Sequence, residues 1–151
     1  MRKQLLPLLA IVLVGVFAAT GQQSTSPAPK RIIYPPEFRA NMPFSPGVKV
    51  GRALYVAGQT GTDLKTGQLA STFEGEVRHT LDNIGVILKA GGMDFSNVVN
   101  VNVYLTDISK FDEMNKVYRE YFKADRPARA TVQVAKLVGA AQIEIACVAH
   151  E

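Results

Sequence analysis

The sequence has few of the residues that build metal and redox centres. One cysteine and two histidines occur in 151 residues. A single cysteine excludes an internal disulfide bond and any site that needs several thiolates, such as a multi-cysteine zinc or iron–sulfur centre. The histidines, His79 and His150, lie far apart in the chain, which argues against a histidine-rich metal site. We therefore expect no metal site, and we expect His79 on the solvent-facing side of a helix.

The familiar catalytic motifs are absent as well. The chain contains no GxSxG nucleophile elbow, no Walker loop, no GxGxxG and no HExxH. Apolar residues make up 47% and charged residues 20%, which is typical of one folded domain and excludes a disordered tail. The formal net charge is +4, but beyond residue 21 only 15 basic and 13 acidic residues remain, a balance of +2. Such a balance is no signature of nucleic-acid binding.

The first 21 residues have the order of a secretory signal peptide. Arg2 and Lys3 form a basic start, an apolar stretch fills positions 5–19, and small residues follow up to Gly21. The apolar stretch has 15 residues, fewer than the roughly 18–20 that a membrane-spanning helix needs. We therefore predict a signal peptide over 1–21 that is cleaved near Gly21, with export to the periplasm or the medium, rather than a stable membrane anchor. Residues 22–29 then form a flexible lead-in to a single domain over 30–151.

The remaining pattern predicts an α+β fold. Strands are expected near 32–33, 48–50, 53–59, 99–105, 130–135 and 143–149, and the second helix over about 110–122. The first helix is expected to begin at Ser71, whose spacing to Glu74 is that of a capping box, and to end at Gly91. The order β-β-β-α-β-α-β-β places two helices on one face of a six-stranded sheet.

The other face of that sheet needs a partner. We expect Val99, Val101, Val103 and Leu105 on the dry face of their strand. The uncovered face is expected to carry residues such as Tyr104, Val132 and Val134, or their strand neighbours. An apolar uncovered face favours a homo-oligomer. The apolar and aromatic stripe of the second helix is expected in the core, and it comprises Phe111, Met114, Val117, Tyr118 and Tyr121.

Two charged residues are unusual for their positions. Arg129 begins a predicted strand, and Glu144 lies between Ile143 and Ile145 in an apolar strand, where glutamate is rare. A carboxylate in such a place must be solvated, paired or hydrogen-bonded. Residue types alone favour an Arg129–Glu144 ion pair that joins two strands, and they leave a functional role open. Cys147 shares strand parity with the isoleucines and is expected to pack in the core.

The residues from 126 to 149 resemble the C-terminal signature of the RidA family, also called YjgF or reactive intermediate deaminase. The resemblance rests on Pro127-Ala128-Arg129, on Val132 to Leu137, and on Ile143-Glu144-Ile145. Further upstream, similar motifs occur at Val56–Gln59, Lys65–Gly67, Leu81–Ile84, Val103–Phe111, and at Asn115 with Tyr118. Together they cover about residues 30–149.

This resemblance implies a chorismate-mutase-like fold, a homotrimer, and ligand sites in the clefts between subunits. It also implies hydrolysis of 2-imino or 2-enamino acids to 2-keto acids and ammonia, without metal or organic cofactor. In that reaction Arg129 binds the substrate carboxylate and Glu144 positions or activates the attacking water. The backbone at Gly58 helps to hold the ligand, and Asn115 contributes a polar contact.

Three positions in the implied substrate site depart from the family pattern. Phe44, Ala57 and Thr131 stand where the well-studied deaminases have tyrosine, serine and cysteine. A less polar pocket fits a bulkier imino acid, or it indicates binding without turnover. Two other functions therefore stay open: a trimeric module that binds small carboxylates or a protein, and the ribonuclease activity ascribed to some relatives. We rank ribonuclease last, and expect no nucleic-acid partner, because Arg126, Arg129 and Lys136 lack an aromatic stacking platform.

Overall fold

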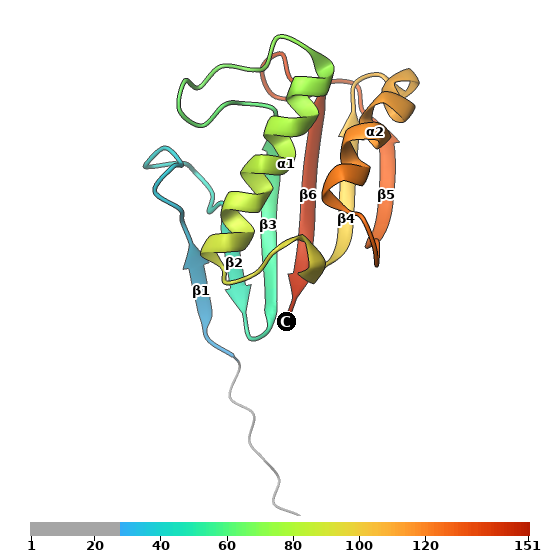
Figure 1. Cartoon of the computed structure of the whole chain (residues 1–151). Helices are drawn as coiled ribbons and strands as arrows, with labels where there is room; N and C mark the ends of the chain where they lie inside the picture. Colours follow the sequence, from blue (N-terminus) through green and yellow to red (C-terminus); the bar gives the residue numbers. More distant parts are fainter. Residues whose placement is uncertain (1–27) are drawn as a thin grey trace, which may run out of the picture.

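The computed structural model describes residues 28–151, so the predicted signal peptide and nearly all of the lead-in lie outside the described residues. Six strands and two α-helices make up this part of the chain (Figure 1). The strands are β1 (Lys30–Ile33), β2 (Gly47–Val50), β3 (Ala53–Thr60), β4 (Val98–Leu105), β5 (Ala128–Gln133) and β6 (Ile143–His150), and the helices are α1 (Phe73–Ala90) and α2 (Phe111–Tyr121).

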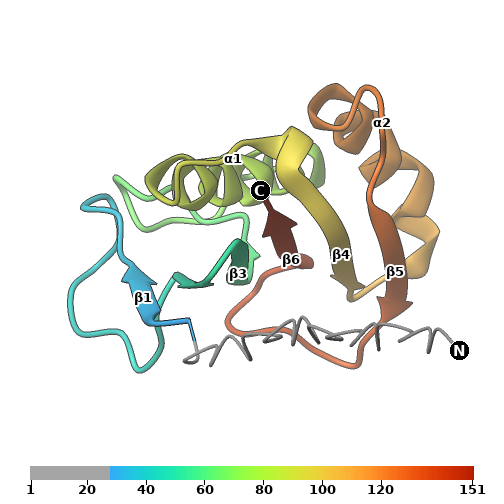
Figure 2. The ribbon, with the colours of Figure 1, turned by 90° about the horizontal axis from the view of Figure 1, so that it is seen from below.

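The strands form one sheet in the order β1-β2-β3-β6-β4-β5. All neighbouring pairs are antiparallel except β4 and β5, which run parallel and are joined through α2. Both helices lie on one face of the sheet, and no helix within residues 28–151 covers the other face, which we call the uncovered face (Figure 2). The predicted α+β architecture is therefore confirmed. No helix within residues 28–151 is long and apolar enough to cross a membrane.

The hydrophobic core lies between the helices and the sheet. The predicted stripe of α1, which comprises Val77, Leu81, Ile84 and Leu88, is buried, and so is Cys147. Burial raises the pKa of the Cys147 thiol to about 12, so this thiol stays protonated at neutral pH. Its predicted packing role is confirmed.

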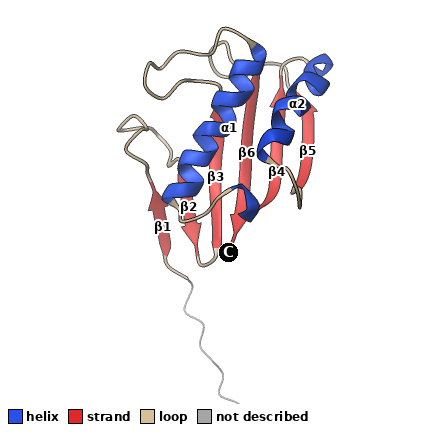
Figure 3. Cartoon of the chain, viewed as in Figure 1, coloured by secondary structure: helices blue, strands red, loops and turns tan. Residues whose placement is uncertain are grey.

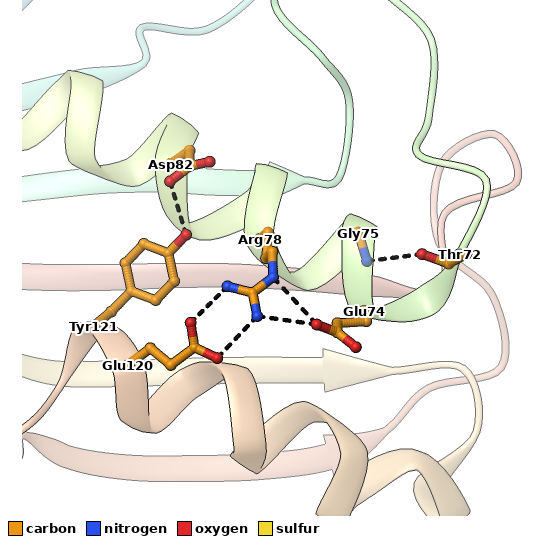
Figure 4. Close-up of polar contacts among 7 residues, drawn as sticks. All are labelled: Thr72, Glu74, Gly75, Arg78, Asp82, Glu120 and Tyr121. Atoms are coloured by element: carbon orange, nitrogen blue, oxygen red, sulfur yellow. Dashed lines mark hydrogen bonds and ion pairs between the residues drawn. The ribbon is translucent and has the colours of Figure 1, made fainter.

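The helix α1 begins one residue later than the sequence indicated. Its N-cap is Thr72, whose Oγ1 accepts a hydrogen bond from the Gly75 backbone amide at 3.1 Å. The predicted capping box of Ser71 and Glu74 is therefore wrong. Glu74 instead accepts hydrogen bonds from Arg78, one turn further along the helix (Figure 4).

Three further expectations about single residues are also wrong. Val99 is 50% exposed, because the pairing of β4 with β6 shifts register between Val98 and Asn100, so Val98 takes the inward position. Phe111 is 37% exposed rather than in the core, whereas Val132 is on the uncovered face as expected. His79 is half-buried rather than solvent-facing, because residues 63–65 lie beside it.

The two helices are tied together at the surface. The guanidinium of Arg78 on α1 bonds both carboxylate oxygens of Glu120 on α2, at 2.6 and 2.8 Å. Close by, the Tyr121 hydroxyl donates to Asp82 at 2.8 Å (Figure 4). These contacts fix the position of α2 against α1, and α2 in turn covers the β4–β5 edge of the sheet (Figure 2).

Three long connections meet at one end of the sheet. Figure 3 shows the β1–β2, β3–α1 and β5–β6 loops at the same end of the strands. The β3–α1 loop contains the predicted Lys65–Gly67 turn, in which Asp63 Oδ1 accepts from the backbone amides of Lys65 and Thr66 at 2.8 Å each. Asn83 on α1 anchors this loop by donating to the carbonyl oxygens of Thr60 and Thr62.

Candidate active site

Four of the predicted site residues meet in one cavity. Phe44, Ala57, Gly58 and Glu144 line a space of about 390 Å³ together with Thr60 and Val138. We call this cavity the glutamate pocket. It brings the β1–β2 loop, the end of β3, the β5–β6 loop and the start of β6 to one place.

A β-bulge shapes the wall of the glutamate pocket. The pairing of β3 with β6 shifts register between Val56 and Gln59, so Ala57 and Gly58 fall in the irregular stretch. A Cβ atom at Gly58 would overlap the Oε1 atom of Glu144. Glycine lets the carboxylate lie directly against the backbone of β3, and any larger residue here would force the Glu144 side chain to move.

The alternation of β6 directs Glu144 away from the helices. Ile143 and Ile145 are buried on the side of the sheet that α1 covers, so Glu144 between them lies on the uncovered face. Here it pairs with Tyr104 on β4 and with Thr60 on β3. Glu144 is half-buried, which leaves its carboxylate within reach of a ligand in the pocket.

A buried carboxylate that the sequence reasoning missed holds the chain just before Glu144. Glu76 on α1 accepts hydrogen bonds from the backbone amide and the side-chain amide of Gln142, both at 2.8 Å. Its position three residues after Phe73 and four before Thr80, both buried, was the signal that it faces inward. Glu76 thus fixes the end of the β5–β6 loop, and through it the start of β6.

A second cavity of about 430 Å³ adjoins the glutamate pocket and shares Phe44, Gly58, Thr60 and Val138 with it. Gln59 stiffens the common wall, because its Nε2 donates to the carbonyl oxygens of Ala57 and Gly58 at 3.1 Å. Apolar side chains, including Phe38, Met42 and Leu64, line the rest of this second cavity together with polar ones. A ligand bound at Glu144 therefore has room for an apolar side chain.

The other three predicted residues lie elsewhere, between α2 and β5. The guanidinium carbon of Arg129 is 4.5 Å from the ring centroid of Tyr118 and 5.5 Å from that of Phe111. Asn115 is buried on α2, the helix that also carries Tyr118 and Phe111. Thr131 follows on the same face of β5, and its buried Oγ1 has no hydrogen-bond partner among the described residues. We call this group the arginine site.

The arginine site and the glutamate pocket are on opposite faces of the sheet. Arg129 pairs with Val101 and Glu144 with Tyr104, so β4 separates the two residues and they lie about 10 Å apart along the strands. No ion pair joins them within residues 28–151. The predicted ion pair between Arg129 and Glu144, which would have joined two strands, is therefore wrong. One subunit therefore cannot bring both side chains to the same small ligand.

The described part of the chain also offers no metal centre. It contains no group of three His, Cys, Asp or Glu side chains that could hold a metal ion. The chemistry available in the two sites is a carboxylate in a partly apolar pocket and a guanidinium on an aromatic face.

Comparison with known proteins finds a protein family that this chain matches over most of its length. Residues 35–151 match the family described as Endoribonuclease L-PSP. A human protein named 2-iminobutanoate/2-iminopropanoate deaminase is 47% identical over 108 residues, which cover 71% of this chain and 79% of that protein.

Solved structures have the same fold. RidA from an Antarctic Psychrobacter species superposes with a TM-score of 0.76 at 34% identity, covering 80% of this chain and 100% of that one. The structure of TdcF from E. coli with bound serine gives a TM-score of 0.76 at 29% identity, covering 80% of this chain and 98% of that one.

Proposed function

The chain belongs to the Endoribonuclease L-PSP family, which includes RidA and YjgF, and on this premise we propose that it is a deaminase of 2-imino and 2-enamino acids. The product pair is a 2-keto acid and ammonia. The observation that carries the proposal is the Glu144 carboxylate held against Gly58 in a ligand-sized pocket. The names of close relatives support the same reaction.

Each residue has a chemical task in this reaction. The planar guanidinium of Arg129 matches a carboxylate with two parallel hydrogen bonds, and so orients the substrate. Glu144 accepts a proton from water as the water oxygen bonds to C2 of the protonated imine. Glu144 then gives this proton to the nitrogen of the carbinolamine and takes up the hydroxyl proton as the C–N bond breaks, which releases the ketone and ammonia. The ammonia carries the remaining proton away as ammonium, so Glu144 is again a carboxylate. The overall step is a hydrolysis without redox change.

We propose that the active site forms between two copies of the chain in a homotrimer. The arginine site of one copy would face the glutamate pocket of the next, which would unite the residues that one subunit keeps apart. Apolar side chains on the uncovered face support this, since Tyr55 is 52% exposed and Val132 47% exposed. Small-molecule binding, rather than nucleic-acid or membrane binding, fits the size of the pocket.

The test is a coupled assay with purified mature protein. An amino acid oxidase generates 2-iminopropanoate, 2-iminobutanoate or a bulkier apolar imino acid, and keto-acid release is followed against spontaneous hydrolysis. We expect acceleration by the wild-type protein and its loss in Arg129→Ala and Glu144→Gln. Arg126→Ala is the matched control, because Arg126 is in the same segment and donates to the Phe122 carbonyl oxygen instead.

The outcomes separate the candidate functions. No acceleration with any of these imino acids would contradict the deaminase proposal. Keto-acid binding without turnover, abolished by Arg129→Ala, would instead favour the binding module.

We also propose that the protein is exported after cleavage near Gly21. The basic start and the short apolar stretch of residues 1–21 support this. The first residue of the protein recovered outside the cytoplasm tests it, and an intact Met1 on cytosolic protein would contradict it.

A further inference from the structure

We propose that Tyr118 is a positioning residue whose ring holds the guanidinium of Arg129 in the orientation that binds the substrate carboxylate. The inference rests on the proposed function, since it takes Arg129 as the carboxylate ligand. The resemblance and the comparisons assign Tyr118 no part in the reaction. Its part follows from the contacts between α2 and β5.

The ring of Tyr118 lies under the guanidinium of Arg129. The distance of 4.5 Å from the guanidinium carbon to the ring centroid is well inside the roughly 6 Å limit for a cation–π contact. The ring of Phe111 adds a second, longer contact at 5.5 Å. Because an arginine side chain has several rotatable bonds, such contacts remove rotamer freedom that ligand binding would otherwise have to remove.

The platform under Arg129 is itself rigid. Tyr118 is only 4% exposed, and its ring stacks on Phe122 with a centroid distance of 4.4 Å and an interplanar angle of 26°. Phe122 packs edge-on against Phe95 at 5.2 Å. A stack that continues into the core cannot tilt without disturbing its neighbours, so it gives Arg129 a fixed support.

An aromatic support leaves the arginine free to act. No carboxylate within residues 28–151 forms an ion pair with Arg129. A carboxylate partner would fix the guanidinium but would also compete with the substrate for the same N–H donors. The ring face attracts the cation without accepting its in-plane hydrogen bonds, so the donors stay available for a ligand carboxylate.

The ring and the hydroxyl of Tyr118 can be tested apart. The hydroxyl is buried and has no hydrogen-bond partner among the described residues. Burial raises the pKa of Tyr118, and the positive charge of Arg129 opposes that rise only in part. The phenol is therefore neutral at physiological pH, and the contact that the geometry defines is between the face of its ring and the guanidinium of Arg129.

The experiment compares Tyr118→Phe and Tyr118→Leu with Tyr121→Leu as matched control. Tyr121 lies on the same helix and packs edge-on against Phe95 at 5.3 Å, but it bonds Asp82 instead of contacting Arg129 (Figure 4). Each variant is assayed for kcat and KM with 2-iminobutanoate. The affinity for 2-ketobutanoate and for its uncharged amide is measured separately by calorimetry.

We expect Tyr118→Leu to weaken 2-ketobutanoate binding and raise KM about five- to tenfold, the range that loss of a cation–π contact allows. Binding of the amide should stay within twofold, because it does not use the carboxylate contact. Tyr118→Phe and Tyr121→Leu should bind both ligands like the wild type. Phe111→Leu, at a side chain that is 37% exposed, should give a smaller weakening in the same direction and serves if Tyr118→Leu fails to fold.

Wild-type affinity for 2-ketobutanoate in a folded Tyr118→Leu protein would overturn the proposal. So would an equal loss in Tyr118→Phe, because it would place the effect in the hydroxyl. Failure of the wild-type protein to hydrolyse imino acids would contradict the proposed function alone, since the binding measurements do not depend on turnover.

Discussion

At the scale of single residues, the glutamate pocket depends on Gly58, a residue without a side chain. Gly58 leaves the space that the Glu144 carboxylate occupies, and the bulge in β3 brings the two residues together. The sequence named both residues through the resemblance. It did not show their contact, because a bulge breaks the alternation from which strand neighbours are read.

Gly58→Ala should therefore impair catalysis more than folding. The added methyl group would overlap Oε1 of Glu144 and turn the carboxylate away from its place, so we expect kcat to fall about tenfold or more. Stopped assays with 2-iminobutanoate measure kcat, and the thermal midpoint controls for stability. Unchanged kcat in the folded variant would show that the Gly58–Glu144 contact does not matter for turnover.

Strand parity places Arg129 and Glu144 on opposite faces of the sheet. Placing Val132 on the uncovered face puts Arg129 on the helix face, whereas Glu144 between two inward isoleucines is on the uncovered face. Parity alone thus argued against an ion pair in one subunit. The position of β4 between β5 and β6 could not be predicted from the sequence, because strand order depends on long-range pairing.

At the scale of elements, helix α1 shows how the starting point of a helix depends on the loop before it. Ser71 and Thr72 are both good N-cap residues, so residue type could not choose between them. The β3–α1 loop decides, because the bridge between Thr62 and Leu69 and the bond from the Ala70 amide to the Gly61 carbonyl fix where the chain turns. The periodic stripe of α1, by contrast, is local and was predicted correctly.

The two neighbouring hydroxyls give a direct test of this cap. Thr72→Ala removes the acceptor for the Gly75 amide and should lower the free energy of unfolding by about 1 kcal/mol. Ser71→Ala is the matched control and should change it by no more than about 0.5 kcal/mol. Urea unfolding measures both. A larger loss for Ser71→Ala than for Thr72→Ala would contradict the assignment of the N-cap.

At the scale of the whole molecule, one chain places the two halves of the proposed active site on opposite faces of its sheet. A complete site then needs two copies of the chain. Glu144 is on the uncovered face, and Arg129 is on the helix face near the edge strand β5. A closed ring of identical copies repeats one contact at every interface, so each interface would join one arginine site to one glutamate pocket. The same contact would cover the apolar residues of the uncovered face.

Mixing two inactive variants tests this claim most directly. Arg129→Ala and Glu144→Gln are unfolded together, refolded as a mixture, and assayed with 2-iminobutanoate beside each variant refolded alone. If each site takes its arginine from one copy and its glutamate from the next, random mixing leaves both residues intact in about a quarter of the sites. We predict recovery of about a quarter of the wild-type kcat in the mixture and background activity in either variant alone. Background activity in a mixture that contains mixed oligomers would contradict an active site shared between two copies.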